Sequence, residues 1–178
     1  REGTVVDADQ LFDEIHALAK KEILNRVIDL TPEELETRAE IIGVGAVKFM
    51  LLKVNPKNAM KFDPEAAVKF EGDTGALVQY AYARISSIKR KASKKKINKA
   101  VDWSLMTHAK ERELAIKCAQ YPGILKKSAR DYDCCCLATY LLELARTFNS
   151  FYHDCPVIKG DVSPLIRRSR LELIDRVQ

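Results

Sequence analysis

The feature that most constrains the fold of this chain is an apolar repeat of helical period that runs along most of its length. Apolar side chains recur three and four positions apart from Leu11, Ile15 and Leu18 onward to Ile28, and similar runs follow. Residues on this spacing share one face of an α-helix. Only Thr4–Val6 suggests a strand. The sequence therefore predicts an all-α fold, built as a helical bundle preceded by two helices.

Side chains that commonly begin helices punctuate the repeat. Asp7 or Asp9 is expected to begin the first helix, and Thr31, Pro32 and Glu34 form a capping-box pattern for a second helix that extends to about Leu52. Further helices are expected after Asp63, after the N-cap candidate Asp73, after Asp133 and from Ser163. Another helix is expected over residues 104–119. Tyr121-Pro122-Gly123 is expected to end it, and a short helix over 124–129 to follow.

Two glycines interrupt the second predicted helix. Gly43 and Gly45 each cost about 1 kcal/mol relative to alanine inside a helix, so they are expected to allow close approach of another backbone. The turn at Asn55-Pro56 follows that helix. We place a domain boundary there, which gives two linker helices in residues 1–58 and a helical bundle in residues 59–178.

Composition excludes several classes of protein. The 178 residues are 47% hydrophobic, which is enough for a packed core, and the net charge of +5 is only a weak indication of an acidic partner. No apolar run is long enough to span a bilayer, and no secretory signal pattern is present. The five cysteines are then expected to be reduced thiols in a cytoplasmic protein. The start at Arg1 indicates a piece of something longer.

A basic segment, RISSIKRKASKKKINK, covers residues 84–99 and contains no acidic residue. It has two interpretations, a solvated linker or a patch that contacts phosphates. Tyr80 and Tyr82 lie just before it. Aromatic rings beside cations suit unpaired RNA bases, which favours the second interpretation.

A second unusual stretch, FNSFYHDCPVI, covers residues 148–158. Phe148 and Phe151 are expected to fill the end of the bundle, whereas Tyr152 and His153 fall on other faces and are candidates for stacking. His153, Cys155 and the cysteines at 134–136 suggest a zinc site. The spacing matches no closed four-ligand site, so no metal site is predicted.

Several segments resemble arginyl-tRNA synthetases, the class I enzymes that attach arginine to its tRNA using ATP. The resemblance is carried by MKFDPEAAVKFEGDTGALVQYAYARISSI at 60–88, LATYLLELARTFNSFYHDCPVI at 137–158 and RRSRLELIDRV at 167–177. REGTVVDADQLFDEI at 1–15 and IGVGAVKFMLL at 42–52 are similar as well. These motifs occur in the order of the C-terminal part of that family, and together they cover essentially the whole chain.

The resemblance implies that the two parts of the chain have different roles. Residues 1–58 correspond to helices that follow the KMSKS-type loop and contact the tRNA stem, and residues 59–178 to the anticodon-binding bundle. ATP with Mg serves the upstream catalytic domain, whose HIGH motif is not present here, so the chain is expected to contain no catalytic residue and no cofactor. The implied partners are tRNA(Arg) and the upstream catalytic domain of the same chain, in a monomer with no membrane association.

The resemblance also implies a binding site. The turn Gly72-Asp73-Thr74-Gly75 is expected to direct the following helix toward the anticodon loop. Tyr80 is expected to stack on a base, and Arg84 with some of the following lysines to hold phosphates. Ala76-Leu77 stands where the family usually has Pro-Tyr, and Tyr82 replaces a common histidine. The predicted tRNA-binding residues are Gln79, Tyr80, Arg84, Lys89, Arg90 and Tyr152.

Two alternatives remain open at this point. One is a helical protein-interaction module that holds acidic proteins on its basic surface. The other is a metal-dependent helical enzyme that uses the cysteines and His153.

Overall fold

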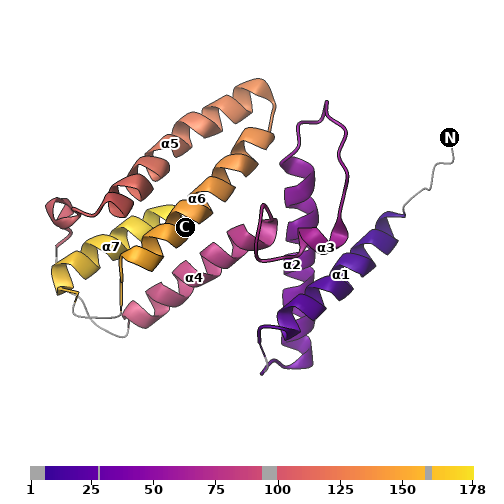
Figure 1. The fold of residues 1–178 in the computed structure, drawn as a ribbon, viewed down its shortest axis with the longest axis horizontal. Coiled ribbons are helices and arrows are strands. Elements are labelled where there is room, and N and C mark those ends of the chain that lie inside the picture. Colours follow the sequence, from indigo (N-terminus) through magenta and orange to yellow (C-terminus); the bar gives the residue numbers. More distant parts are fainter. Residues whose placement is uncertain (1–6, 28, 94–99, 159–161) are drawn as a thin grey trace. The chain divides into compact units, whose positions relative to one another are not determined.

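The structure is a computed structural model that describes residues 7–27, 29–93, 100–158 and 162–178 (Figure 1). All regular structure within these ranges is helical, which confirms the predicted all-α fold. The strand suggested for Thr4–Val6 lies outside the described residues. So do Ile28 and residues 94–99 of the basic segment.

The chain divides into two compact units, Arg1–Gln79 and Tyr80–Gln178. We call them unit 1 and unit 2 and describe each by itself. The division falls inside helix α4, which covers Gly75–Ser93. The domain boundary expected after residue 58 was placed at the turn Asn55-Pro56, and it stays a prediction.

Unit 1 contains α1 (Ala8–Leu24), α2 (Pro32–Leu52) and α3 (Pro64–Ala67). Their starts confirm the predictions from side-chain chemistry. Asp7 caps α1, Thr31 and Glu34 form a reciprocal capping box on α2, and Asp63 caps α3. The apolar repeat predicts that this helix continues to Val27, but α1 ends at Leu24. Leu24 and Val27 are exposed, so no burial rewards a longer helix.

The core of unit 1 forms where α1 packs on α2. Ile15, Ala19 and Ile23 of α1 are buried against Ala39, Ala46, Val47 and Met50 of α2. A Cβ added at Gly43 would lie 3.0 Å from Cγ2 of Ile15, and a Cβ added at Gly75 would lie 2.8 Å from the carbonyl oxygen of Gly45. Gly45 therefore lies at a close approach of another backbone, as predicted, whereas the atom nearest to a Cβ at Gly43 belongs to the side chain of Ile15.

The start of α4 differs in one detail from the prediction. Thr74, not Asp73, supplies the capping hydrogen bond, because its Oγ1 accepts from the backbone N–H of Leu77 at 3.2 Å. The same hydroxyl donates to the carbonyl of Lys69 at 2.6 Å. Gly72 has a φ of +87°, a conformation that L side chains rarely adopt. The glycine turn before α4 is thus fixed by local bonds.

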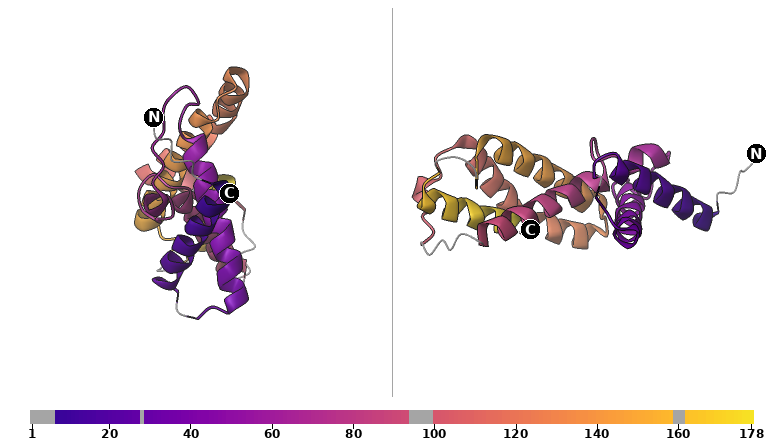
Figure 2. Two further views of the ribbon diagram at one scale, coloured as in Figure 1. Left: turned by 90° about the vertical axis from the view of Figure 1, so that its right-hand side faces the viewer. Right: turned by 90° about the horizontal axis from the view of Figure 1, so that it is seen from below.

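Unit 2 contains the rest of α4, a short 3₁₀ helix η1 (Trp103–Leu105), α5 (Ala109–Asp131), α6 (Cys135–Asp154) and α7 (Pro164–Val177). Figures 1 and 2 show α5 and α6 running side by side, and α7 packs on both. Phe148 and Phe151 are fully buried, which confirms their expected role in filling the bundle. Ile85, Leu114 and Ile174 complete the centre of this core.

Helix α5 corrects two predictions. It begins at Ala109 instead of near Ser104, and it continues through Pro122 instead of breaking there. A proline inside a helix removes one backbone hydrogen bond and crowds the preceding turn. Here α6 supports that turn, since the hydroxyl of Tyr140 donates to the carbonyl of Lys117 at 2.9 Å. Tertiary packing thus outweighs the local preference to break.

Asp133 was predicted to cap α6. Cys134 stands at the N-cap position of α6, and its side chain forms no capping hydrogen bond. Asp133, the residue before it, supplies a hydrogen bond to the start of the helix instead. Its Oδ1 accepts from the backbone N–H of Cys135 at 2.8 Å. Ser163 caps α7 as expected, accepting from the N–H of Ile166 at 3.3 Å.

Two polar contacts tie α7 into unit 2. Glu111 at the start of α5 is 1% exposed and accepts from Nε of Arg170 at 2.6 Å. The hydroxyl of Ser169 donates to the carbonyl of Asp102 and accepts from its N–H, both at 2.9 Å. Burial of these groups is tolerated because each finds its partner.

Candidate nucleic-acid interface

Three of the predicted tRNA-binding residues meet in unit 2. Tyr80 and Arg84 lie one turn apart on α4, and Tyr152 lies on α6. The guanidinium carbon of Arg84 is 4.5 Å from the ring centroid of Tyr80 and 5.3 Å from that of Tyr152. We call these three residues the tyrosine–arginine cluster. It places a cation between two aromatic rings from different helices.

Hydrogen bonds fix the orientation of Arg84. Its Nη1 donates to Oδ1 of Asn149 at 2.8 Å, and its Nη2 donates to the hydroxyl of Tyr80 at 2.7 Å. Both terminal nitrogens therefore already have protein partners. Sequence reasoning missed Asn149, although it lies three residues before Tyr152 in the same unusual stretch. That spacing places the two on one face of α6.

The cluster is anchored on one side and open on the other. Tyr152 is half-buried and stacks on the buried Phe148, with ring centroids 6.1 Å apart and an interplanar angle of 24°. Tyr80 is 41% exposed. An incoming planar group can therefore reach a ring whose neighbours are already held in place.

A surface pocket of about 360 Å³ adjoins the cluster. Besides the cluster itself, Ser87 and Lys91 of α4 line it with polar groups, and Ala83, Ile88 and Ile158 line it with apolar ones. The rings offer π-faces, the lysine offers a positive charge, and the serine hydroxyl can donate or accept. These are the groups that an unpaired nucleobase and its phosphate require.

Two further predicted residues follow on α4. Lys89 forms an ion pair with Asp175 of α7, and its Nζ also donates to Oε1 of Gln178 at 2.9 Å. The hydrogen bond from Lys89 lowers the pKa of the Asp175 carboxyl. Arg90 is exposed on α4. Lys89 is thus directed to α7 and is not part of the cluster.

Gln79 lies at the end of unit 1, and its amide is directed to α2. Its Nε2 donates to the carbonyl of Ile41 at 3.0 Å, and a Cβ added at Gly45 would lie 2.2 Å from that nitrogen. Its Oε1 is buried without a hydrogen-bond partner among the described residues. The structure therefore does not place Gln79 in the cluster, and its role in RNA binding stays a prediction.

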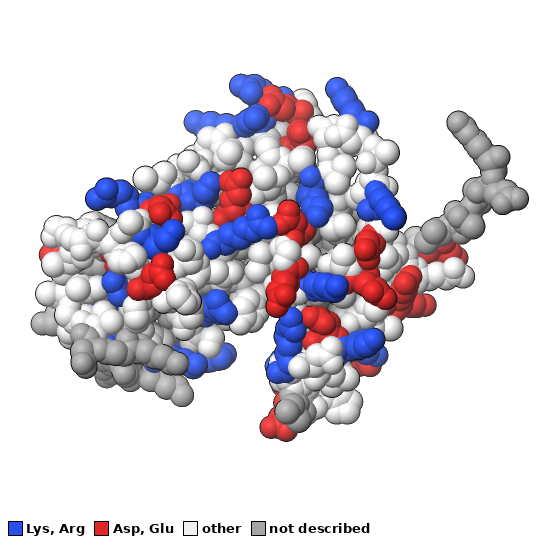
Figure 3. Space-filling view, viewed as in Figure 1, with Lys and Arg blue, Asp and Glu red and all other residues white. Residues whose placement is uncertain are grey.

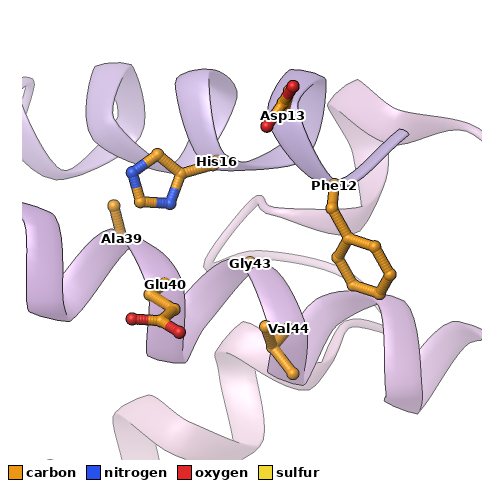
Figure 4. Close-up of a pocket in the computed structure, with 7 residues that line it drawn as sticks. All are labelled: Phe12, Asp13, His16, Ala39, Glu40, Gly43 and Val44. Atoms are coloured by element: carbon orange, nitrogen blue, oxygen red, sulfur yellow. The ribbon is translucent and has the colours of Figure 1, made fainter. Parts of the chain in front are cut away.

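A second pocket, of about 370 Å³, lies between α1 and α2 in unit 1. Figure 4 shows Phe12 and His16 reaching from α1 on either side of Gly43, which forms the floor. Asp13 and Glu40 add two carboxylates to its lining. Negative charge at this pocket repels phosphates, so it is a poorer site for RNA than the pocket of unit 2.

The two units also differ in overall charge. Unit 1 has 15 Asp and Glu against 10 Lys and Arg, a net charge of −5, whereas unit 2 has 10 acidic against 20 basic residues, a net charge of +10. Acidic side chains gather over α1 in Figure 3. The modest net charge of the whole chain is therefore the sum of an acidic unit 1 and a strongly basic unit 2.

The cysteines and histidines form no metal centre among the described residues, where no group of three or more His, Cys, Asp or Glu side chains is arranged to hold an ion. Cys155 is buried, and burial raises the pKa of its thiol. His153 is exposed and pairs with Asp154 at 2.6 Å.

No helix in the described part of the chain combines the length and apolar character that a membrane span requires.

Comparison with known proteins gives consistent matches. A family model described as the DALR anticodon binding domain matches residues 78–178. The chain is 37% identical over 177 residues to the arginine–tRNA ligase of Parabacteroides distasonis and 36% identical over 183 residues to that of Treponema pallidum. These matches cover 97% and 100% of this chain but only 30% and 31% of the relatives. The chain thus spans less than a third of their length.

Solved structures agree with these matches. The arginyl-tRNA synthetase of Thermus thermophilus superposes with a TM-score of 0.90 at 30% identity, covering 99% of this chain and 30% of that one. The synthetase of Plasmodium falciparum gives a TM-score of 0.80 at 25% identity, covering 97% of this chain and 30% of that one.

Proposed function

We infer the function from one premise: this chain belongs to the DALR anticodon binding domain family. The resemblance to arginyl-tRNA synthetases that the motifs predict is confirmed by the relatives and by the similar structures. We propose that the chain is the C-terminal, tRNA-binding part of an arginine–tRNA ligase. In this proposal unit 2 holds the anticodon loop of tRNA(Arg).

The observation that carries this proposal is the tyrosine–arginine cluster beside its pocket. Arg84 is held by Asn149 and by the hydroxyl of Tyr80, and it in turn lies against both tyrosine rings. The rings are therefore positioned before RNA arrives, which reduces the ordering cost of binding. Each base that stacks on such a ring contributes about 1–3 kcal/mol.

The cations divide into two roles in this proposal. Arg84 braces the rings, because both of its terminal nitrogens are already bonded within unit 2. This differs from the expectation that Arg84 itself holds phosphates. Lys91 lines the pocket and contacts the phosphate beside the stacked base, with Arg90 and the rest of the basic segment contributing general attraction. Ser87 is placed to read a base edge.

The chemistry of aminoacylation is assigned to the remainder of the ligase. ATP with Mg would be bound there, as the resemblance to arginyl-tRNA synthetases implies. The turn Gly72-Asp73-Thr74-Gly75 also matches neither common phosphate-loop pattern. No step through ATP is therefore assigned to this chain. The tRNA partner, the monomeric state and the cytoplasmic location are part of the same proposal.

Binding of fluorescent tRNA(Arg), measured by anisotropy at fixed salt, tests the proposal. Tyr80→Ala and Tyr152→Ala are each expected to weaken binding about tenfold, which corresponds to the loss of one stacking contact. Tyr82→Ala is the matched control, because Tyr82 is also exposed on α4 but does not line the pocket. Equal affinity for tRNA(Arg) and an unrelated tRNA, or equal loss in all three variants, would refute the proposal.

A further inference from the structure

The turn between α5 and α6 contains the one non-glycine residue with a positive φ in the described part of the chain. Tyr132 has φ +49° and ψ +37°, the left-handed helical conformation. Helices often end in this conformation, but glycine or asparagine usually occupies the position. A bulky side chain there is a genuine outlier, because its Cβ crowds the neighbouring backbone.

The turn is held together without the tyrosine ring. The N–H groups of Tyr132 and Asp133 both donate to the carbonyl of Ser128, the latter at 3.1 Å. The hydroxyl of Ser128 donates back to the carbonyl of Asp133 at 2.8 Å. All of these bonds use backbone groups or the serine side chain. A glycine or asparagine at position 132 could form the same turn with less strain.

The ring of Tyr132 also contributes nothing visible to packing. The residue is 95% exposed, more than any other large hydrophobic residue among those described. A strained backbone that displays an exposed ring is an arrangement that folding alone does not explain. Such outliers are concentrated at sites that bind something.

The charges around the ring indicate what it binds. Asp131 is paired with Arg130 at 2.7 Å, and the carboxylate of Asp133 accepts from the N–H of Cys135. Both acids of the turn are therefore engaged locally. Lys126 and Lys127, at the end of α5, are exposed. At the top of Figure 3, where Figure 1 places this turn, basic side chains project beside acidic ones.

We propose that Tyr132 is a second RNA contact of unit 2, at which the ring stacks on an unpaired base while Lys126 and Lys127 hold neighbouring phosphates. This inference rests on the proposed function, since the RNA is the same tRNA. A rigid ring beside exposed cations is the combination that binds unpaired nucleotides. A tyrosine that anchors a protein interface is instead surrounded by contacts that exclude water, whereas this ring stands alone.

The test uses the whole chain and fluorescent tRNA(Arg). Tyr132→Asn suits the left-handed turn, so its melting temperature is expected to equal or exceed that of the unsubstituted chain. Its affinity for tRNA(Arg) is nevertheless expected to fall about fivefold or more, while Tyr132→Phe retains affinity because it keeps the ring. Lys126→Ala with Lys127→Ala should reduce the salt dependence of binding. Ile116→Ala, another exposed position on α5, serves as the control.

The outcomes separate this inference from the proposed function. If Tyr132→Asn binds tRNA(Arg) normally while Tyr80→Ala does not, the second contact is refuted and the cluster stands. The same result is expected if Tyr132 contacts a protein instead of RNA, so that case also refutes the second contact. If Tyr132→Asn weakens binding while Tyr80→Ala does not, the cluster is refuted and the second contact stands. If the unsubstituted chain fails to bind tRNA, both are refuted.

Discussion

Replacing Arg84 with lysine separates two roles that a cation in this position can have. The substitution keeps one positive charge but removes the planar fork that reaches both Asn149 and Tyr80. If Arg84 contacts phosphate as a point charge, lysine should replace it. If Arg84 braces the rings, lysine should fail, although the charge of the site is unchanged.

The expected loss follows from the contacts. One of the two hydrogen bonds disappears, at about 0.5–1.5 kcal/mol. The contacts of the guanidinium with the two rings, at 4.5 and 5.3 Å, weaken as well, at about 0.5–1 kcal/mol for a partly exposed site. We therefore expect Arg84→Lys to cost about 1–2.5 kcal/mol of binding free energy, or about 5- to 70-fold in Kd.

Anisotropy titrations with fluorescent tRNA(Arg) at several salt concentrations give both the affinity and its salt slope. Arg84→Lys is expected to lower the affinity and leave the slope unchanged, since no phosphate contact is lost. Lys91→Arg is the converse control and should bind normally. The reasoning is refuted if Arg84→Lys binds like the unsubstituted chain while Arg84→Ala loses both affinity and about one unit of slope.

Three further predictions concern stability. Glu111→Gln should lower the urea midpoint by the equivalent of about 3–5 kcal/mol, because it leaves Arg170, only 13% exposed, without its charge partner; an unchanged midpoint would contradict this. Gly75→Ala should cost about 1–3 kcal/mol in thermal melts, since its Cβ would lie 2.8 Å from the carbonyl of Gly45, and a normal melt would count against this packing. The pKa of Asp175 is lowered by its lysine partner, so this carboxylate stabilises the fold above about pH 4 and loses its effect as pH falls through its folded pKa. Asp175→Asn should therefore show a smaller drop in urea midpoint between pH 7 and pH 3, and an identical drop would disprove the assignment.

Local side-chain chemistry made much of the fold predictable. Thr31 and Asp63 begin their helices as expected because a capping bond spans only two or three residues and needs no tertiary contact. Asp73 is the predicted cap of α4, and Thr74, a residue type that also caps helices, stands next to it. Thr74 takes the role because its hydroxyl also bonds the carbonyl of Lys69, a contact that depends on the folded turn.

The remaining differences arise between elements. Pro122 was expected to end a helix, and only the contact of Tyr140 with the turn before it shows why α5 continues. The cluster was predictable in part, because Tyr80 and Arg84 are one turn apart and share a helix face. Asn149 was not, since its contact with Arg84 depends on the register between α4 and α6. No periodicity within one helix specifies that register.

The opposite charges of the two units bear on selectivity. A chain of net charge +5 would attract any RNA weakly, but here +10 resides in unit 2 and −5 in unit 1. In the proposed function, unit 2 supplies the general attraction for RNA, whereas unit 1 repels phosphates that approach it without a matching contact. Stem contact by the helices of unit 1, which the family resemblance implies, would then rest on a few placed cations and not on overall charge. Because specificity is a difference of affinities, we expect the negative charge of unit 1 to weaken wrongly placed RNA more than correctly placed tRNA.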